Sequence, residues 1–180
     1  RYPPKIAKQE HLKELVMDKL IERELLTGMA DNLGFVVTDD EVDDQIGDGN
    51  AFQIQLIEPA TERLLAVRAG DAIVDVACGA GRFARRMAEL GAGVVAFDYS
   101  EEFIERARER TPTDASIEYH VVDAGNAHAL LSLGTNRFNK AVCTMALMDM
   151  PEIRTLFSTL PRMLTLDGSF VFPITHPCFH

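Results

Sequence analysis

Three aspartates and two glycines have the types and the spacing to form a binding site. Asp75 stands four residues before Gly79, Asp98 follows Gly81 by seventeen positions, and Asp123 ends a further apolar stretch. A glycine has no Cβ, so the backbone can turn sharply there and a ligand can lie against it. A carboxylate can accept hydrogen bonds from a pair of ribose hydroxyls. The set therefore predicts a site for a nucleoside-containing ligand, with a tight turn that binds nothing as the alternative.

The segments around these residues must bring them to one edge of a sheet. The apolar run at residues 73–77 is rich in β-branched side chains and predicts a strand buried on both faces. Residues 82–90 carry apolar side chains at helical spacing, and residues 94–97 form a second apolar run that ends on Asp98. Strand, glycine loop, helix and strand make a βαβ unit of about 30 residues, which builds a parallel sheet. The helix then directs its free N–H groups into the crevice at the strand ends.

The glycine loop is compatible with two kinds of nucleotide. Residues 79–84 satisfy the pattern G-x-G-x-x-A of dinucleotide-binding folds. Asp75 argues against that class, because a carboxylate inside the first strand suits a cationic amino-acid ligand better than a pyrophosphate. The third predicted strand, residues 117–123, again ends on an acid. A nicotinamide-dependent oxidoreductase stays open as an alternative, although we find no site for a hydride acceptor.

Three segments, DVACGAG at residues 75–81, AFDYS at 96–100 and VDA at 122–124, resemble the first three motifs of class I S-adenosylmethionine-dependent methyltransferases. The resemblance is closest to the small-molecule type of this family. It implies an S-adenosyl-L-methionine site in which Asp98 binds the ribose and Asp123 the adenine amino group. The cofactor-binding residues that the resemblance implies are Asp75, Ala77, Cys78, Gly79, Gly81, Asp98, Tyr99, Asp123, Ala124 and Thr144.

Ala77 departs from the family's pattern, and Asp123 has an alternative role. Ala77 stands where the family usually has the first glycine of its loop, which is a mild departure from the pattern. For Asp123, capping a helix at residues 126–133 is an alternative to a ligand contact.

The end of the fourth predicted strand, residues 141–147, is the place where a methyl group would face its acceptor. The segment 144–150 carries three methionines, which could line an adaptable apolar pocket or form ordinary core packing. It lacks the Asn/Asp-Pro-Pro-aromatic pattern of methyltransferases that act on nucleic-acid amino groups. His176 is a candidate general base, with a structural histidine before a proline as the alternative. No catalytic triad is expected, because the cofactor's sulfonium supplies the leaving group and the protein mainly aligns the reactants.

We expect an α/β fold: a doubly wound, Rossmann-like sheet of mainly parallel strands in the order 3-2-1-4-5, with helices on both faces. A helix at residues 51–67 precedes the first strand and is kinked or divided at Pro59. Its predicted apolar stripe consists of Phe52, Leu56, Ala60 and Leu64. A helix at residues 151–164 and a fifth strand at residues 169–174 follow later. The family normally continues with two further strands, so the edge of the fifth strand is expected to be exposed and open to self-association.

Residues 1–47 have a different pattern and carry no catalytic set. A long helical pattern is followed by a capping box that opens a short second helix. Residues 13–26 and 33–42 resemble the N-terminal helical region of the SurA and PpiD folding factors, without their isomerase domain. We expect a junction at residues 47–50 and a methyltransferase domain over residues 48–180. The helical extension is then either one part of a fusion or a lid recruited onto that domain.

Composition limits the partners of this chain. Its 180 residues carry a net charge of −10, and no basic patch is present to replace the counterions of a nucleic acid. No apolar run is long enough to span a membrane, and no secretory leader opens the sequence. The chain begins at Arg1 rather than at a methionine, which points to a trimmed product or a fragment. Three widely spaced cysteines without zinc or redox spacing indicate reduced thiols and a cytoplasmic location.

The function that the sequence favours is S-adenosyl-L-methionine-dependent methyl transfer to a small-molecule acceptor. The oxidoreductase with the same glycine loop is one alternative. The other is a protein without enzymatic activity, in which residues 1–47 form a chaperone-like binding module attached to an inactive methyltransferase fragment.

Overall fold

The structure is a computed structural model, which describes residues 53–174. Its elements, in chain order, are η1 (Gln53–Ile57), α3 (Glu58–Leu65), β1 (Ala72–Val76), α4 (Arg82–Glu89), β2 (Gly93–Asp98), α5 (Glu101–Glu109), β3 (Ile117–Val121), α6 (Ala127–Ser132), β4 (Phe138–Val142), η2 (Leu147–Asp149), α7 (Arg154–Met163) and β5 (Leu164–Val171). The predictions for the N-terminal helices, the junction at residues 47–50 and the candidate base His176 lie outside the described residues.

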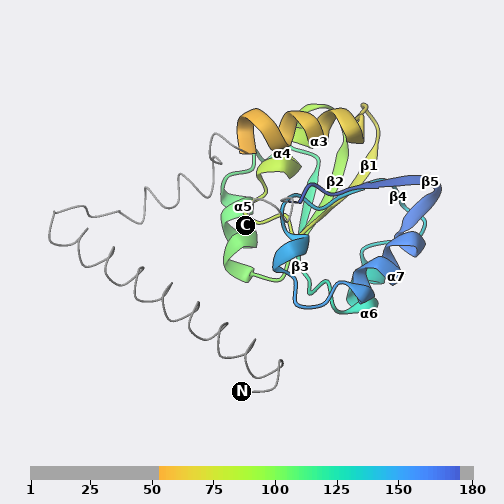
Figure 1. Cartoon of the computed structure of the whole chain (residues 1–180). Coiled ribbons are helices and arrows are strands. Elements are labelled where there is room, and N and C mark those ends of the chain that lie inside the picture. Colours follow the sequence, from red (N-terminus) through yellow and green to blue (C-terminus); the bar gives the residue numbers. More distant parts are fainter. Residues whose placement is uncertain (1–52, 175–180) are drawn as a thin grey trace, which may run out of the picture. The chain divides into compact units, whose positions relative to one another are not determined.

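The strands form one sheet in the order β3-β2-β1-β4-β5 (Figure 1). All neighbouring strands in it are parallel. The chain builds outward from β1 through β2 to β3 and then returns to place β4 on the other side of β1. This reversal creates a crevice at the carboxyl ends of β1 and β4, where parallel sheets bind their ligands. The predicted fold class and strand order are confirmed.

Helices cover both faces of the sheet (Figure 1). α3, α4 and α5 lie on one face, where Met87 and Ile104 pack against Ile73 of β1. α6 and α7 lie on the other face, against Val74 and Val76 of the same strand. Side chains of a strand alternate between the two faces, and both faces of β1 are buried, as the run of β-branched residues predicts.

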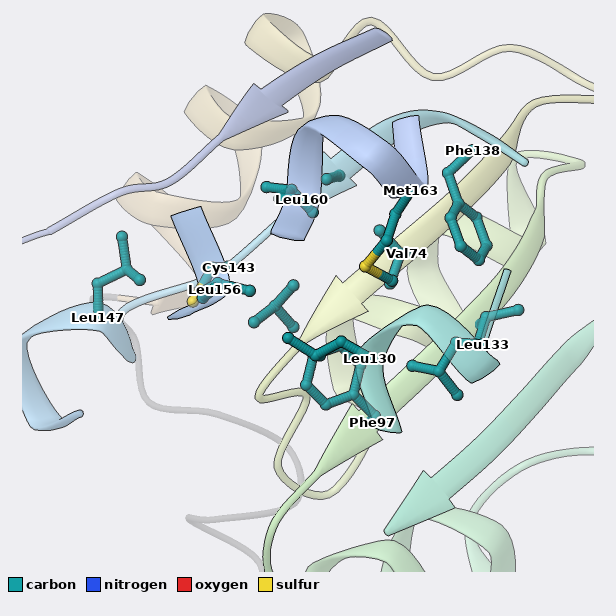
Figure 2. Packing of buried hydrophobic residues seen from close by; sticks show 13 residues of the cluster. Val74, Phe97, Leu130, Leu133, Phe138, Cys143, Leu147, Leu156, Leu160 and Met163 are labelled. Carbon is teal, nitrogen blue, oxygen red and sulfur yellow. The ribbon is translucent and has the colours of Figure 1, made fainter. Parts of the chain in front are cut away.

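Figure 2 shows the core between the sheet and the helices α6 and α7. Side chains from three strands and both helices converge there, including Val74, Phe97, Leu130, Phe138 and Met163, each at most 1% exposed. Burying one such side chain contributes about 1.5–3 kcal/mol. This packing fixes the positions of the strand ends that carry the candidate site.

The helix predicted at residues 51–67 is divided near Pro59, as expected. A π-helical turn, η1, passes into α3 at Glu58. Pro59 lies in the first turn of α3. Backbone N–H groups in the first turn make no hydrogen bond within the helix, so a proline, which has no N–H, costs little there.

The apolar stripe predicted for this helix is wrong. Leu56 is 58% and Leu64 is 73% exposed, while α3 buries Thr61 and Leu65 instead. A spacing of four residues drifts around a helix of 3.6 residues per turn, and the wider turn of η1 adds to that drift. The buried face therefore lies one residue further along the chain than predicted.

The last two strands also differ from the prediction. β4 ends at Val142, because Met145 has a φ of 57° and the chain then enters the short helix η2. β5 begins at Leu164, directly after α7 and before the predicted start at residue 169, and its pairing with β4 is irregular between Leu164 and Ser169. No helix in residues 53–174 has the length and the apolar character to cross a bilayer.

Candidate functional site

A crevice of about 160 Å³ opens at the carboxyl end of β1. Its walls include five of the predicted cofactor-binding residues, namely Asp75, Ala77, Cys78, Gly79 and Thr144. Asp75 comes from β1, the next three residues come from the loop that follows β1, and Thr144 follows β4. The crevice lies where the strand order reverses, and the structure thus brings these five residues together.

The loop after β1 follows a left-handed path that favours glycine. Ala77, Gly79 and Gly81 have φ values of 53°, 52° and 74°. A Cβ on Gly79 would meet no atom within 4 Å, whereas a Cβ on Gly81 would lie 2.3 Å from the hydroxyl oxygen of Tyr119. Tyr119 of β3 donates that hydroxyl proton to the Gly81 carbonyl at 3.5 Å. Gly79 therefore keeps the crevice open, and Gly81 allows the loop to lie against Tyr119.

Asp98 joins β2 to the same loop. Its Oδ2 accepts a hydrogen bond from the Gly79 N–H at 2.9 Å, and its Oδ1 accepts one from the Ser100 N–H at 3.0 Å. The side chain is only 5% exposed. Each carboxylate oxygen keeps a further lone pair, so the ribose contact stays a prediction beside this structural role.

Asp75 is the most unusual side chain of the crevice. It is 2% exposed, and its Oδ2 has no hydrogen-bond partner among the described residues. Burial, and then the negative charge of Asp98, raise the pKa of Asp75 to about 8. The Thr144 hydroxyl oxygen is likewise buried without a partner in the described part of the chain.

These two polar atoms fit a ligand that carries a positive charge and hydrogen-bond donors. Buried polar atoms in folded proteins almost always have partners, so their pairing with a ligand accounts for both. An ammonium group can donate to the carboxylate of Asp75 and offset its burial. A pyrophosphate at the same place carries no ammonium group to pair with Asp75.

The cysteines near the crevice are not nucleophiles. Burial raises the pKa of the Cys78 thiol far above its ordinary value and that of Cys143 to about 12. Both thiols therefore stay protonated at neutral pH, and a protonated thiol is a poor nucleophile. Among residues 53–174, no group of three His, Cys, Asp or Glu side chains is placed to bind a metal ion.

Besides Gly81 and Asp98, three predicted residues lie outside the wall of the crevice. Tyr99 is 78% exposed. Asp123 is exposed and accepts a hydrogen bond from the Gly125 N–H at 2.7 Å. Ala124 packs against the core beneath α6 and α7. The structure places the first two at neighbouring strand ends, after β2 and β3, on the same edge of the sheet as the crevice.

The predicted end of the third strand is wrong, and the alternative role of Asp123 as a helix cap is excluded. β3 ends at Val121, two residues before Asp123. α6 takes Asn126 as its N-cap, because the Asn126 side chain accepts a hydrogen bond from the Ala129 N–H at 3.1 Å. Asp123 thus closes a tight turn and does not cap the helix.

An ion pair that the sequence analysis missed forms one rim of the crevice. Glu58 of α3 accepts hydrogen bonds from two nitrogens of Arg82 at 2.5 and 2.9 Å. One turn further along both helices, Glu62 pairs with Arg86 at 3.0 Å. The signal in the sequence was an acidic pair four residues apart on one helix and a basic pair four residues apart on the next.

A larger groove of about 510 Å³ lies between α3 and α4, and its lining residues include Ile54, Arg63 and Leu90. None of the predicted site residues lies in it. We therefore place the candidate site in the smaller crevice, where the buried polar atoms are.

Comparison with known proteins identifies a methyltransferase domain in this chain. Residues 73–168 match the family described as Methyltransferase domain, and residues 1–56 match the SurA-like N-terminal domain. A demethylmenaquinone methyltransferase of Clavibacter sepedonicus is 33% identical over 65% of this chain and 46% of its own length. A ubiquinone biosynthesis O-methyltransferase of Xanthomonas oryzae pv. oryzae is 26% identical over 67% of this chain and 51% of its own.

Solved structures show the same fold. An S-adenosylmethionine-dependent methyltransferase from Mesorhizobium loti shares 35% identity and a TM-score of 0.61 with this chain, over 72% of this chain and 56% of the other. The chain spans about half the length of the curated relatives it matches.

Proposed function

This chain belongs to the methyltransferase domain family, and on that basis we propose that it transfers a methyl group from S-adenosyl-L-methionine to a small-molecule acceptor. The observation that supports this most is the pair of buried, unpartnered polar atoms, Asp75 Oδ2 and Thr144 Oγ1, in a crevice beside the glycine loop. The cofactor carries a positive charge at the end that would lie there.

In this proposal, different residues of the chain bind different parts of the cofactor. Asp75 would bind the ammonium of the amino-acid end, and the loop at Gly79 would let the cofactor lie against the backbone. Asp98 binds the ribose hydroxyls while it holds the loop. Tyr99 and Asp123, at the next strand ends, face the adenine. The ribose and adenine assignments are those that the family resemblance implies, and the position of these side chains at neighbouring strand ends supports them.

Methyl transfer requires little of the protein beyond the alignment of cofactor and acceptor. Bound S-adenosyl-L-methionine supplies an activated methyl group and a neutral thioether as the leaving group. The chain holds the cofactor and acceptor in line and excludes water, which can lower the barrier by several kcal/mol. An acceptor with a free electron pair then needs no nucleophile from the enzyme.

The acceptor enters past the segment that follows β4. Met148 in this segment is 39% exposed, whereas Met150 packs against the core beneath α6 and α7. One methionine of the segment is thus available to an apolar acceptor, and another is ordinary core. The two curated relatives are named for demethylmenaquinone and for ubiquinone biosynthesis, so quinone-type rings are the first acceptors to test.

We further propose two domains, a helical segment at residues 1–47 and the methyltransferase domain at residues 48–180. The protein works in the cytoplasm with reduced thiols, and its net charge of −10 leaves nucleic acids out of its partners. β5 pairs with β4 alone among the described strands, which leaves an edge through which two copies could associate.

Calorimetric titration of the purified chain tests the cofactor. We expect S-adenosylhomocysteine to bind and NADH to leave the heat signal unchanged, because a pyrophosphate has no positively charged donor for the buried carboxyl group of Asp75. Binding of NADH without binding of S-adenosylhomocysteine would establish the oxidoreductase alternative. Binding of neither by a folded chain would leave the fold without the activity and turn attention to residues 1–47.

A further inference from the structure

Asp75 is a buried acid that no positive charge balances in the described part of the chain. It is 2% exposed. Its side chain lies on the sheet face that α3, α4 and α5 cover, because it stands two residues after Ile73 in β1 and alternate side chains of a strand lie on the same face. No described lysine or arginine forms an ion pair with it, whereas Glu58 at the rim of the same crevice is paired with Arg82. A carboxylate buried in this way is costly, so a neutral carboxyl group is the form that fits the free chain.

The groups around Asp75 come from every element that meets at the strand ends. The titratable and charged ones are Asp98 of β2, Cys78 of the loop, Cys143 after β4, Tyr119 of β3, Arg85 and Arg82 of α4, and Glu58 of α3. Arg85 donates to the Ala80 carbonyl at 2.8 Å. Among the described residues, Asp98 is the charge that shifts the pKa of Asp75, and its negative sign favours the protonated form.

Other groups of the crevice are poorly suited to release a proton near pH 7. Burial raises the pKa values of both the Cys78 thiol and the Tyr119 hydroxyl above their ordinary range. No histidine lies among the described residues that line the crevice. Asp75 is therefore the group whose proton a ligand would displace.

We propose that the crevice exchanges a proton for its ligand: Asp75 is a neutral carboxyl group in the free chain and releases its proton when a ligand with an ammonium group binds beside it. The inference rests on the proposed function and adds a regulatory property to the same site. The O–H bond of the carboxyl group breaks, the proton passes to the solvent, and the carboxylate accepts a hydrogen bond from the ammonium. No other bond changes and nothing is oxidised.

The expected size follows from the titration of Asp75. A group with a pKa of about 8 is roughly nine-tenths protonated at pH 7, so binding should release about 0.9 protons at that pH. The dissociation constant should then fall nearly tenfold from pH 6 to pH 7 and level off above pH 8. The affinity therefore rises with pH, because the free chain must lose a proton in order to bind.

Calorimetry measures this release directly. S-adenosylhomocysteine is titrated into the full chain at pH 7 in phosphate, HEPES and Tris, whose ionisation enthalpies differ, and the slope of the observed enthalpy against them counts the protons. The same titration is made with Asp75→Asn, which is isosteric with the neutral carboxyl group, and with Asp114→Asn, an exposed acid away from the crevice. 5′-Methylthioadenosine, which lacks the amino-acid end, serves as a ligand without the ammonium.

We expect a slope near 0.9 protons for the chain and for Asp114→Asn, and a slope near zero for Asp75→Asn. 5′-Methylthioadenosine should bind without release. Tight binding of S-adenosylhomocysteine with no release, or an unchanged release in Asp75→Asn, would overturn the inference and leave the proposed function intact. Failure of the folded chain to bind S-adenosylhomocysteine would overturn the proposed function and the inference with it.

Discussion

The two glycines of the loop after β1 should respond differently to the same substitution. Gly79 and Gly81 both have positive φ, at 52° and 74°, and both belong to the segment that borders the crevice. A Cβ on Gly79 meets nothing within 4 Å. A Cβ on Gly81 lies 2.3 Å from the Tyr119 hydroxyl oxygen and 2.9 Å from the Cβ of Ala107. Replacing each by alanine therefore separates backbone strain from steric overlap.

The magnitudes follow from these contacts. The left-handed conformation costs an alanine about 1 kcal/mol at either position. Overlap in a closely packed core adds about 1–3 kcal/mol, and only Gly81→Ala meets it. We expect Gly79→Ala to lower the free energy of unfolding by about 1 kcal/mol and Gly81→Ala by about 2–4 kcal/mol.

Ligand binding should show the opposite order. The methyl group of Gly79→Ala would project into the crevice, so its affinity for S-adenosylhomocysteine should fall at least tenfold. Gly81→Ala, where folded, should lose less affinity, because its methyl group points toward Tyr119 and α5. Urea unfolding gives the first quantity and calorimetry the second.

A second variant keeps the test informative if Gly81→Ala does not fold. Tyr119→Phe in the Gly81→Ala background removes the oxygen atom that lies closest to the new methyl group and should restore part of the lost stability. Equal destabilisation by the two alanines, or a larger loss of stability at Gly79, would refute the account of the loop. So would an unchanged affinity of Gly79→Ala.

Three further predictions concern ion pairs and the sheet edge. Breaking the Glu58–Arg82 pair with Glu58→Gln should lower stability by about 0.5–1 kcal/mol and weaken S-adenosylhomocysteine binding a few-fold; a double-mutant cycle that shows no coupling would contradict this. Lys140→Met should destabilise the chain by about 2–4 kcal/mol and shift acid unfolding to higher pH. Burial acts to raise the pKa of Asp71, but the hydrogen bonds from Lys140 and its other partners outweigh burial, and the net pKa is lowered from its ordinary value of 3.8. The stability that Asp71 contributes is therefore fully present above pH 3.8 and is lost as the pH falls through the lowered pKa. Self-association through β5 should be abolished by Leu166→Lys, and a monomer of the unmodified chain by light scattering would remove the proposal.

The segment from β1 to β2 could be predicted from the sequence to within about one residue at each end. A strand buried on both faces reads as an uninterrupted apolar run, and glycines mark the turns on either side of the helix. Residues 73–77 and 94–97 were therefore located correctly as strands. The start of α5 also has a signal in the sequence, because serine is a preferred N-cap residue and the Ser100 side chain accepts a hydrogen bond from the Phe103 N–H at 3.3 Å.

Features that depend on distant partners could not be predicted in the same way. The fifth strand was placed too late, because an Asp-Gly pair normally marks a turn, whereas here residues 167–168 lie inside an irregular stretch of β5 that β4 holds by pairing. The apolar stripe on α3 failed because the wide turn of η1 shifts the buried face by one residue. In both cases tertiary packing overrides a local pattern.

The candidate site shows the same division. The family resemblance implied five residues that share the crevice, because strand ends in a parallel sheet meet at one edge. The ion pair between Glu58 and Arg82 spans 24 residues and two helices, so it becomes visible only when α3 is laid beside α4. Neither residue is unusual by itself, and only their facing positions give them a role at the rim.

The raised pKa of Asp75 makes the stability of the free chain depend on pH. Its pKa in the native chain is about 8, against an ordinary value of 3.8, so between these pH values the native chain holds a proton that the unfolded chain has released. The stability of the free chain therefore falls as the pH rises through this window, by up to about 1.4 kcal/mol per pH unit. A cationic ligand reverses the effect, because it stabilises the carboxylate that the sheet alone disfavours. The residue that weakens the free protein at neutral pH is thus the one that makes the bound state selective for positive charge.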